Sequence, residues 1–123
     1  MKLLKINRET FLPSLLDIAG IVEKRHTLPI LSNVLISATG NTLSFIATDL
    51  EIQITTSTSL PDETKEFSFT VSAKKLLEIC RALPEKSDIE IEQIQDHKLS
   101  VKAGKSRFNL QTLPAEDFPR FTS

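Results

Sequence analysis

The chain has 123 residues, of which 40% are hydrophobic and 25% charged, and this composition fits one soluble globular domain with its own core. Its formal net charge is −1, which excludes a bulk basic surface for nucleic acid, so a nucleic-acid-binding role would require a local cluster of positive charge. A single cysteine, Cys80, excludes an intrachain disulfide and fits a reducing, cytoplasmic location. The N-terminus turns polar at once, so neither a signal peptide nor a membrane-spanning helix is expected.

The first half of the chain predicts a strand, a helix and three more strands. Residues 2–6 alternate as a short strand, and an amphipathic helix over residues 8–22 is indicated by apolar side chains at helical spacing, Phe11, Leu15, Ile18 and Val22. Pro13 is tolerated in this helix if the helix starts only a few residues before it. Strands are then expected over residues 31–38, 42–48 and 50–55, with a tight turn at Gly40-Asn41 and a loop over 60–65.

The second half predicts the same order of elements. Residues 67–71 alternate as a strand, Ser72 can cap a helix over residues 73–83, and Pro84 ends that helix. Its apolar stripe is Leu76, Cys80 and Leu83. Three further strands are expected around residues 89–91, 99–101 and 108–110, and residues 113–123 are expected to form an extended exit segment.

Short sequence echoes support an internal repeat of about half the chain. Residues 23–29 resemble residues 78–84, and residues 43–47 resemble residues 99–103. The predicted fold class is therefore α+β: two helices packed on antiparallel sheets, built from a duplicated unit of one strand, one helix and three strands.

Few residues suggest catalysis. Asp49 and Glu51, two apart on a predicted strand, point to the same face, where paired carboxylates could serve acid–base or metal chemistry. The simpler interpretation is a solvent-facing or turn role, with Asp49 bonding the backbone. His26 and His97 each stand alone, His97 in a predicted hairpin turn, and Cys80 belongs to the apolar stripe. No phosphate loop or nucleophile elbow is present in the sequence, so no enzyme activity, metal or cofactor is expected.

The basic residues allow two interpretations. Lys24 and Arg25 follow the first helix, and Lys74 and Arg81 share one face of the second helix with Glu78, next to Lys75. This cluster could bind phosphates without sequence preference. Alternatively, it is a solvated helix face with a Lys74–Glu78 pair.

The last predicted strand also allows two interpretations. Phe108 and Leu110 alternate with Arg107, Asn109 and Gln111, so the apolar pair either faces the core or lies on an edge strand that a partner covers.

Six strings of residues occur in the order and spacing of a known family, at positions 25–33, 47–52, 71–75, 79–84, 106–108 and 112–119. Together they resemble the bacterial DNA polymerase III beta subunit, the DNA sliding clamp, along the whole chain. That family's chain has three domains of similar fold, and the resemblance covers the first of them. It implies that residues 1–123 form the N-terminal clamp domain, with residues 113–123 leading toward a second domain.

The resemblance also implies a function without catalysis. Two chains of the family close into a homodimeric ring around double-stranded DNA and tether the replicative polymerase. The helices line the hole, so Arg25 and Lys74 are expected to face DNA, with Lys24 and Arg81 beside them. Because lysine lacks the guanidinium fork, Lys74 is not expected to make a bidentate phosphate contact. The polymerase and the clamp loader are expected to bind other domains, and no membrane partner is expected.

The subunit boundary is expected at the last strand, through Arg107, Phe108 and Leu110, with Lys75 and Lys105 nearby. Two alternatives from other functional classes stay open. One is an interaction module that uses the Phe108 and Leu110 edge without touching DNA. The other is a hydrolase built on Asp49, Glu51 and a histidine.

Overall fold

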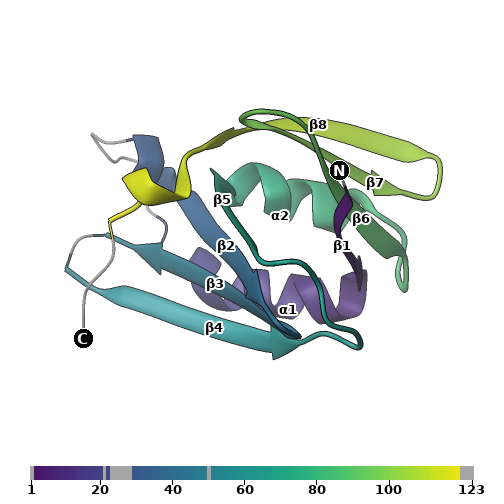
Figure 1. Ribbon diagram of the computed structural model, residues 1–123, viewed down its shortest axis with the longest axis horizontal. Coiled ribbons are helices and arrows are strands. Elements are labelled where there is room, and N and C mark those ends of the chain that lie inside the picture. The colour runs from purple at the N-terminus through teal and green to yellow at the C-terminus, as the bar shows by residue number, and fades with distance from the viewer. Residues whose placement is uncertain (1, 21, 23–28, 50, 120–123) are drawn as a thin grey trace.

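A computed structural model describes residues 2–20, 22, 29–49 and 51–119, and Figure 1 shows its two helices inside a curved antiparallel sheet. The helices are α1 (Arg8–Ala19) and α2 (Ala73–Ala82), and two short 3-10 turns are η1 (Pro29–Ser32) and η2 (Ala115–Asp117). The strands are β1 (Lys2–Asn7), β2 (Asn33–Thr39), β3 (Thr42–Thr48), β4 (Gln53–Ser59), β5 (Phe67–Ser72), β6 (Asp88–Gln95), β7 (Lys98–Ala103) and β8 (Ser106–Leu113).

The eight strands form one sheet in the order β1-β6-β7-β8-β5-β2-β3-β4. Each half of the chain contributes a three-stranded meander, and the two halves exchange their first strands: β1 pairs with β6, and β5 pairs with β2. All these pairings are antiparallel. The predicted α+β class and the duplicated strand–helix–three-strand unit are confirmed.

Side-chain caps start both helices. The Asn7 side chain accepts a hydrogen bond from the Glu9 amide at 2.9 Å, and the Ser72 hydroxyl accepts one from the Lys75 amide at 3.2 Å. The first helix ends at Ala19, with Gly20 as its C-cap, and not at Val22 as predicted. Glycine in this position weakens helix continuation.

Pro13 lies further into α1 than its predicted place near the start of the helix. The helix begins at Arg8, so Pro13 lies in the second turn and not among the first-turn amides that lack helical acceptors. A proline there cannot donate to the carbonyl one turn before it. The packed side chains on either side of Pro13, Phe11 and Leu15, are both fully buried, and this burial offsets the lost hydrogen bond.

Two strand predictions began too early. The segment over 31–38 starts as a 3-10 turn, so β2 begins at Asn33, and the segment over 50–55 enters the sheet only at Gln53. The β2–β3 turn is confirmed, because Thr39 pairs with Thr42 and Gly40 has a φ of 62°, a left-handed conformation that glycine adopts without strain. The exit segment is not wholly extended, since η2 interrupts it and Phe118 is buried, whereas residues 120–123 lie outside the described part.

The core lies between the helices and the sheet. Phe11 of α1 and Phe45 of β3 meet edge to face with ring centroids 5.4 Å apart, and neither is exposed. On α2 the buried residues are Ala73, Leu76, Ile79 and Cys80. With one face of each helix fixed against the sheet, the opposite faces must point away from it.

Candidate nucleic-acid and subunit interface

The outward face of α2 carries the cationic cluster predicted from the sequence. Lys74, Lys75, Glu78 and Arg81 are all exposed, because Leu76, Ile79 and Cys80 hold the other face in the core. No ion pair joins Lys74 to Glu78 among the described side chains, so the pair that would have explained this face as a solvated one is not formed. Arg81 lies in the last turn of the helix, where a positive charge is favourable.

A hollow lies between this face and the end of α1. Its apolar lining comes from Ala19, Val22 and Leu77, and its charged lining comes from Lys74, Glu78 and Arg81. The structure thus brings two of the four predicted DNA-facing residues, Lys74 and Arg81, to one surface. The other two, Lys24 and Arg25, lie outside the described residues.

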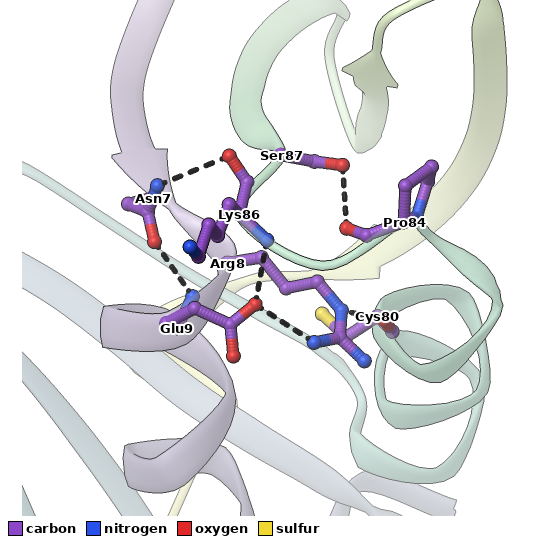
Figure 2. Close-up of polar contacts among 7 residues, drawn as sticks. All are labelled: Asn7, Arg8, Glu9, Cys80, Pro84, Lys86 and Ser87. Carbon is purple, nitrogen blue, oxygen red and sulfur yellow. Dashed lines mark hydrogen bonds and ion pairs between the residues drawn. The ribbon is translucent and has the colours of Figure 1, made fainter.

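A polar junction fixes the start of α1 to the end of α2 (Figure 2). The Arg8 Nε donates to the Cys80 carbonyl at 2.7 Å, and its Nη1 donates to Glu9 Oε1 at 2.9 Å. The same Glu9 oxygen accepts the Lys86 amide at 2.8 Å, and the Arg8 amide donates to the Ser87 carbonyl at 2.7 Å. Because the two helices lie side by side and the start of one meets the end of the other, α1 and α2 run in opposite directions.

The junction also shifts the pKa values of its ionisable groups. The Lys86 amide, followed by the Arg8 side chain, lowers the pKa of Glu9 below its usual 4.5. Burial raises the pKa of the Cys80 thiol to about 11, although the Arg8 charge acts in the opposite direction. At neutral pH Glu9 is therefore ionised and Cys80 is a neutral thiol. Cys80 is fully buried, which confirms the prediction that it is a core residue.

Strand β8 combines a paired edge with an open one. Along Ser106–Gln111 it pairs with β7, but on its other side it pairs with β5 only at Leu113 and Thr112. No strand in the described part of the chain pairs with the remaining length of that second side. An open edge of this kind offers backbone donors and acceptors to another chain.

The predicted subunit residues gather around this strand. Arg107 and Lys105 are exposed, Phe108 is half-buried against the core, and Leu110 is only 9% exposed and belongs to the core cluster. Lys75 lies near them, since it lines a hollow together with Leu110. The core interpretation therefore holds for Leu110, which packs inward. The partner interpretation stays open for Phe108, which retains surface that another chain could cover.

One basic residue near this strand was missed by sequence reasoning. Lys102 of β7 lies opposite Arg107 in the hairpin register, and both are exposed, next to Lys105 in the connecting turn. Like charges opposite each other on a sheet are unfavourable unless something offsets them. Only the strand register reveals that Lys102 and Arg107 lie opposite each other, because the sequence did not specify the length of the turn between them.

Comparisons with known proteins match the chain along its length. The sequence pattern of the DNA polymerase III beta subunit, N-terminal domain, matches residues 1–122. The chain belongs to the DNA polymerase III beta subunit family. It is 48% identical over 114 residues to the Beta sliding clamp of Pseudomonas aeruginosa and 40% identical over 114 residues to that of Escherichia coli. Each alignment covers 93% of this chain and 31% of the relative, so the chain spans about a third of their length.

Solved structures of beta subunits share the fold. The P. aeruginosa DNA polymerase III subunit beta superposes with a TM-score of 0.91 at 45% identity, over 100% of this chain and 32% of that one. The Caulobacter crescentus pol III beta gives a TM-score of 0.90 at 43% identity, over 100% of this chain and 32% of that one. The described part of this chain thus has the fold of about a third of these longer beta subunits.

The described residues that were considered for catalysis do not form the carboxylate pair predicted from the sequence. The prediction that Asp49 and Glu51 share one strand face is wrong: both precede β4, and Asp49 Oδ1 accepts the amides of Glu51 at 2.9 Å and Ile52 at 2.8 Å. This is the backbone-bonding turn role that was the simpler interpretation. His97 lies exposed in the β6–β7 turn as predicted, and His26 is outside the described residues.

The described residues lack two further features. They contain no group of three or more His, Cys, Asp or Glu side chains placed to hold a metal ion. None of their helices is long and apolar enough to cross a membrane.

Proposed function

We propose that this chain forms one sector of a DNA sliding clamp, a ring without catalytic activity that encircles duplex DNA and tethers the replicative polymerase. The observation that carries the proposal is the outward face of α2 in a chain of the beta-subunit family: Lys74 and Arg81 are exposed on a helix whose opposite face packs in the core. Relatives are named Beta sliding clamp, and their longer chains would supply the rest of the ring.

The chemistry of this face suits sliding. Lys74 and Arg81 can contact phosphates without reading bases, and such contacts are individually weak and depend on salt. A net charge of −1 over the chain limits binding of DNA elsewhere on the surface. Lys24 and Arg25 complete the proposed contact set.

The ring boundary is proposed at β8. The open side of Ser106–Gln111 can accept a strand from a neighbouring subunit, Phe108 can bury its remaining surface there, and Arg107, Lys105 and Lys75 can pair with carboxylates of the partner. In such a boundary β8 would meet a different surface of the neighbouring subunit, and a heterologous interface of this kind closes a ring when the rotation between subunits permits it.

The test places this chain in a complete ring. A chimera would carry it in place of the matched N-terminal region of the P. aeruginosa clamp, and the ring would be loaded onto nicked circular DNA. We expect the ring to stay on the circle and to be lost within minutes of linearisation, since only topology holds it. Release from the circle at the rate of linear DNA would contradict the proposal.

The same experiment tests the boundary. Phe108→Ala should shorten the residence time on circular DNA and weaken the dimer in sedimentation by about tenfold, as for a contact residue worth 1–2 kcal/mol. Phe67→Ala is the matched control, because Phe67 is also half-buried but stacks on Phe69 of the same strand, away from β8's open side. Equal effects of the two substitutions would remove Phe108 from the boundary.

A further inference from the structure

The two helices present opposite charge on their outward faces. The exposed residues of α1 are Glu9, Thr10, Pro13, Leu16 and Asp17, at the spacing of a single helical stripe, and Leu16 is 43% exposed. On α2 the corresponding stripe carries Lys74, Lys75 and Arg81 with Glu78. Both helices lie side by side in the curve of the same sheet (Figure 1), so both stripes belong to one surface.

The one cation of α1 is committed to the fold. Arg8 donates a hydrogen bond from Nε to the Cys80 carbonyl and another from Nη1 to Glu9, and its side chain is only 12% exposed. Figure 2 shows the guanidinium turned toward the end of α2. The positive charge of Arg8 is thus paired locally and is withheld from the outward surface.

The rest of the α1 stripe offers almost nothing to a phosphate. Proline and leucine side chains have no donors, a carboxylate repels a phosphate, and only the Thr10 hydroxyl could donate a hydrogen bond. The carboxylate of Glu9 is already matched by Arg8 and by the Lys86 amide. Asp17, in contrast, makes no ion pair with any described side chain, so no cation among these residues is paired with its carboxylate.

We propose that the DNA-facing wall of this domain is one-sided: α2 holds the phosphate backbone, and α1 is a non-contacting face on which Asp17 keeps phosphates away. This inference rests on the proposed function. Its consequence is that the α1 face makes few phosphate contacts, so DNA lies closer to α2. Fewer contacts must then break at each sliding step. At about 0.1 M salt the repulsion by Asp17 decays over about 10 Å, so it acts mainly on phosphates close to α1.

The test reverses one charge on each surface of the chimeric ring and measures affinity for a duplex against salt. Asp17→Lys should raise affinity about two- to fivefold at low salt, the range of an exposed ion pair. It should also steepen the slope of log affinity against log salt by about 0.9, the value for one added phosphate contact. Asp17→Asn should give a smaller gain, and Asp17→Lys should slow one-dimensional diffusion on DNA.

Asp96→Lys is the matched control, because Asp96 is an exposed aspartate in the β6–β7 turn, away from both helices. If Asp17→Lys changes affinity and slope no more than Asp96→Lys does, the one-sided wall is wrong. Lys74→Ala separates this failure from failure of the proposed function: it should weaken binding and flatten the slope, while Lys65→Ala in the β4–β5 loop should not. An unchanged slope for Lys74→Ala would remove α2 as the DNA contact and overturn both proposals.

Discussion

The two halves of the molecule match in their buried positions and differ in their surfaces. Counted from the caps Asn7 and Ser72, Phe11 of α1 corresponds to Leu76 of α2, and Leu15 corresponds to Cys80. All four of these side chains are at most 1% exposed. The outward stripes of the two helices, however, carry opposite charge. A duplicated unit must keep its helix on its sheet, so packing constrains the buried positions and leaves the surface positions to diverge.

The two halves also differ in how the ends of their meanders are covered. Each half closes with a leucine followed by a proline, Leu60-Pro61 after β4 and Leu113-Pro114 at the end of β8. Leu60 is 5% exposed and its amide donates to the Asn41 carbonyl, whereas Leu113 is 40% exposed and pairs with β5. These equivalent leucines are therefore buried to different degrees, because β8 passes from β7 to β5 whereas β4 is the last strand of the sheet.

The largest expected difference between the halves lies in the core. Phe11→Ala should lower the free energy of unfolding by about 3–5 kcal/mol, and Leu76→Ala by about 2–5 kcal/mol. Phe11 should cost more, because its ring also loses the edge-to-face contact with Phe45. Urea unfolding followed by far-ultraviolet circular dichroism measures both, with Leu16→Ala on the outward face as the control. A smaller loss for Phe11→Ala would show that the second half dominates stability.

The polar junction comes next, because its arginine has no counterpart in the second half: the residue of α2 that corresponds to Arg8 is Ala73. Arg8→Met should destabilise the chain by about 1.5–3 kcal/mol, the range for a hydrogen bond to a charged group. The unbranched methionine side chain keeps most of the packing of the arginine stem. The lost free energy of unfolding therefore reports the hydrogen bonds to the Cys80 carbonyl and to Glu9. Arg81→Met, an exposed change on α2, should stay within about 0.5 kcal/mol of the unchanged chain. If the two changes cost the same, the junction does not hold the halves together.

The smallest effect at neutral pH concerns Cys80, where α1 has Leu15. The folded state raises the pKa of this thiol from 9.0 to about 11, so the unfolded chain loses the proton first as pH rises. The stabilisation is complete below pH 9 and is lost progressively as pH rises from 9 to about 11. Cys80→Ala should flatten the fall of unfolding free energy in that window relative to the unchanged chain, with no such difference between pH 6 and 8. Parallel curves for the two chains would place Cys80 in a wetter site.

Much of this architecture was open to prediction from particular residues. Ser72 before an apolar stripe predicted the start of α2, Gly40-Asn41 predicted the β2–β3 turn, and the repeated order of elements predicted the duplication. The failures have physical causes. Alternation of Leu50, Ile52 and Ile54 predicted a strand, but the side chain of Asp49 captures the backbone amides at that point and delays β4 to Gln53.

The candidate site was predictable in its residue types and not in its pairings. Helical spacing places Lys74, Glu78 and Arg81 on one face, yet the sequence cannot say whether Lys74 pairs with Glu78, because surface pairs depend on small differences between rotamers. Arg8 gave no signal at all. Its distant partners, the carbonyls of Cys80 and Ser87, lie more than seventy residues along the chain and meet it only in the fold.

The sequence by itself determined the periodicities, the caps and the turns, and hence two helices, a set of short strands and a doubled unit, because these depend on neighbours within a few residues. The tertiary structure alone decided the exchange of first strands between the halves, the junction at Arg8 and the half-open edge of β8. These features depend on contacts between distant segments. Local preferences are compatible with several such arrangements, and only the shared core selects one of them.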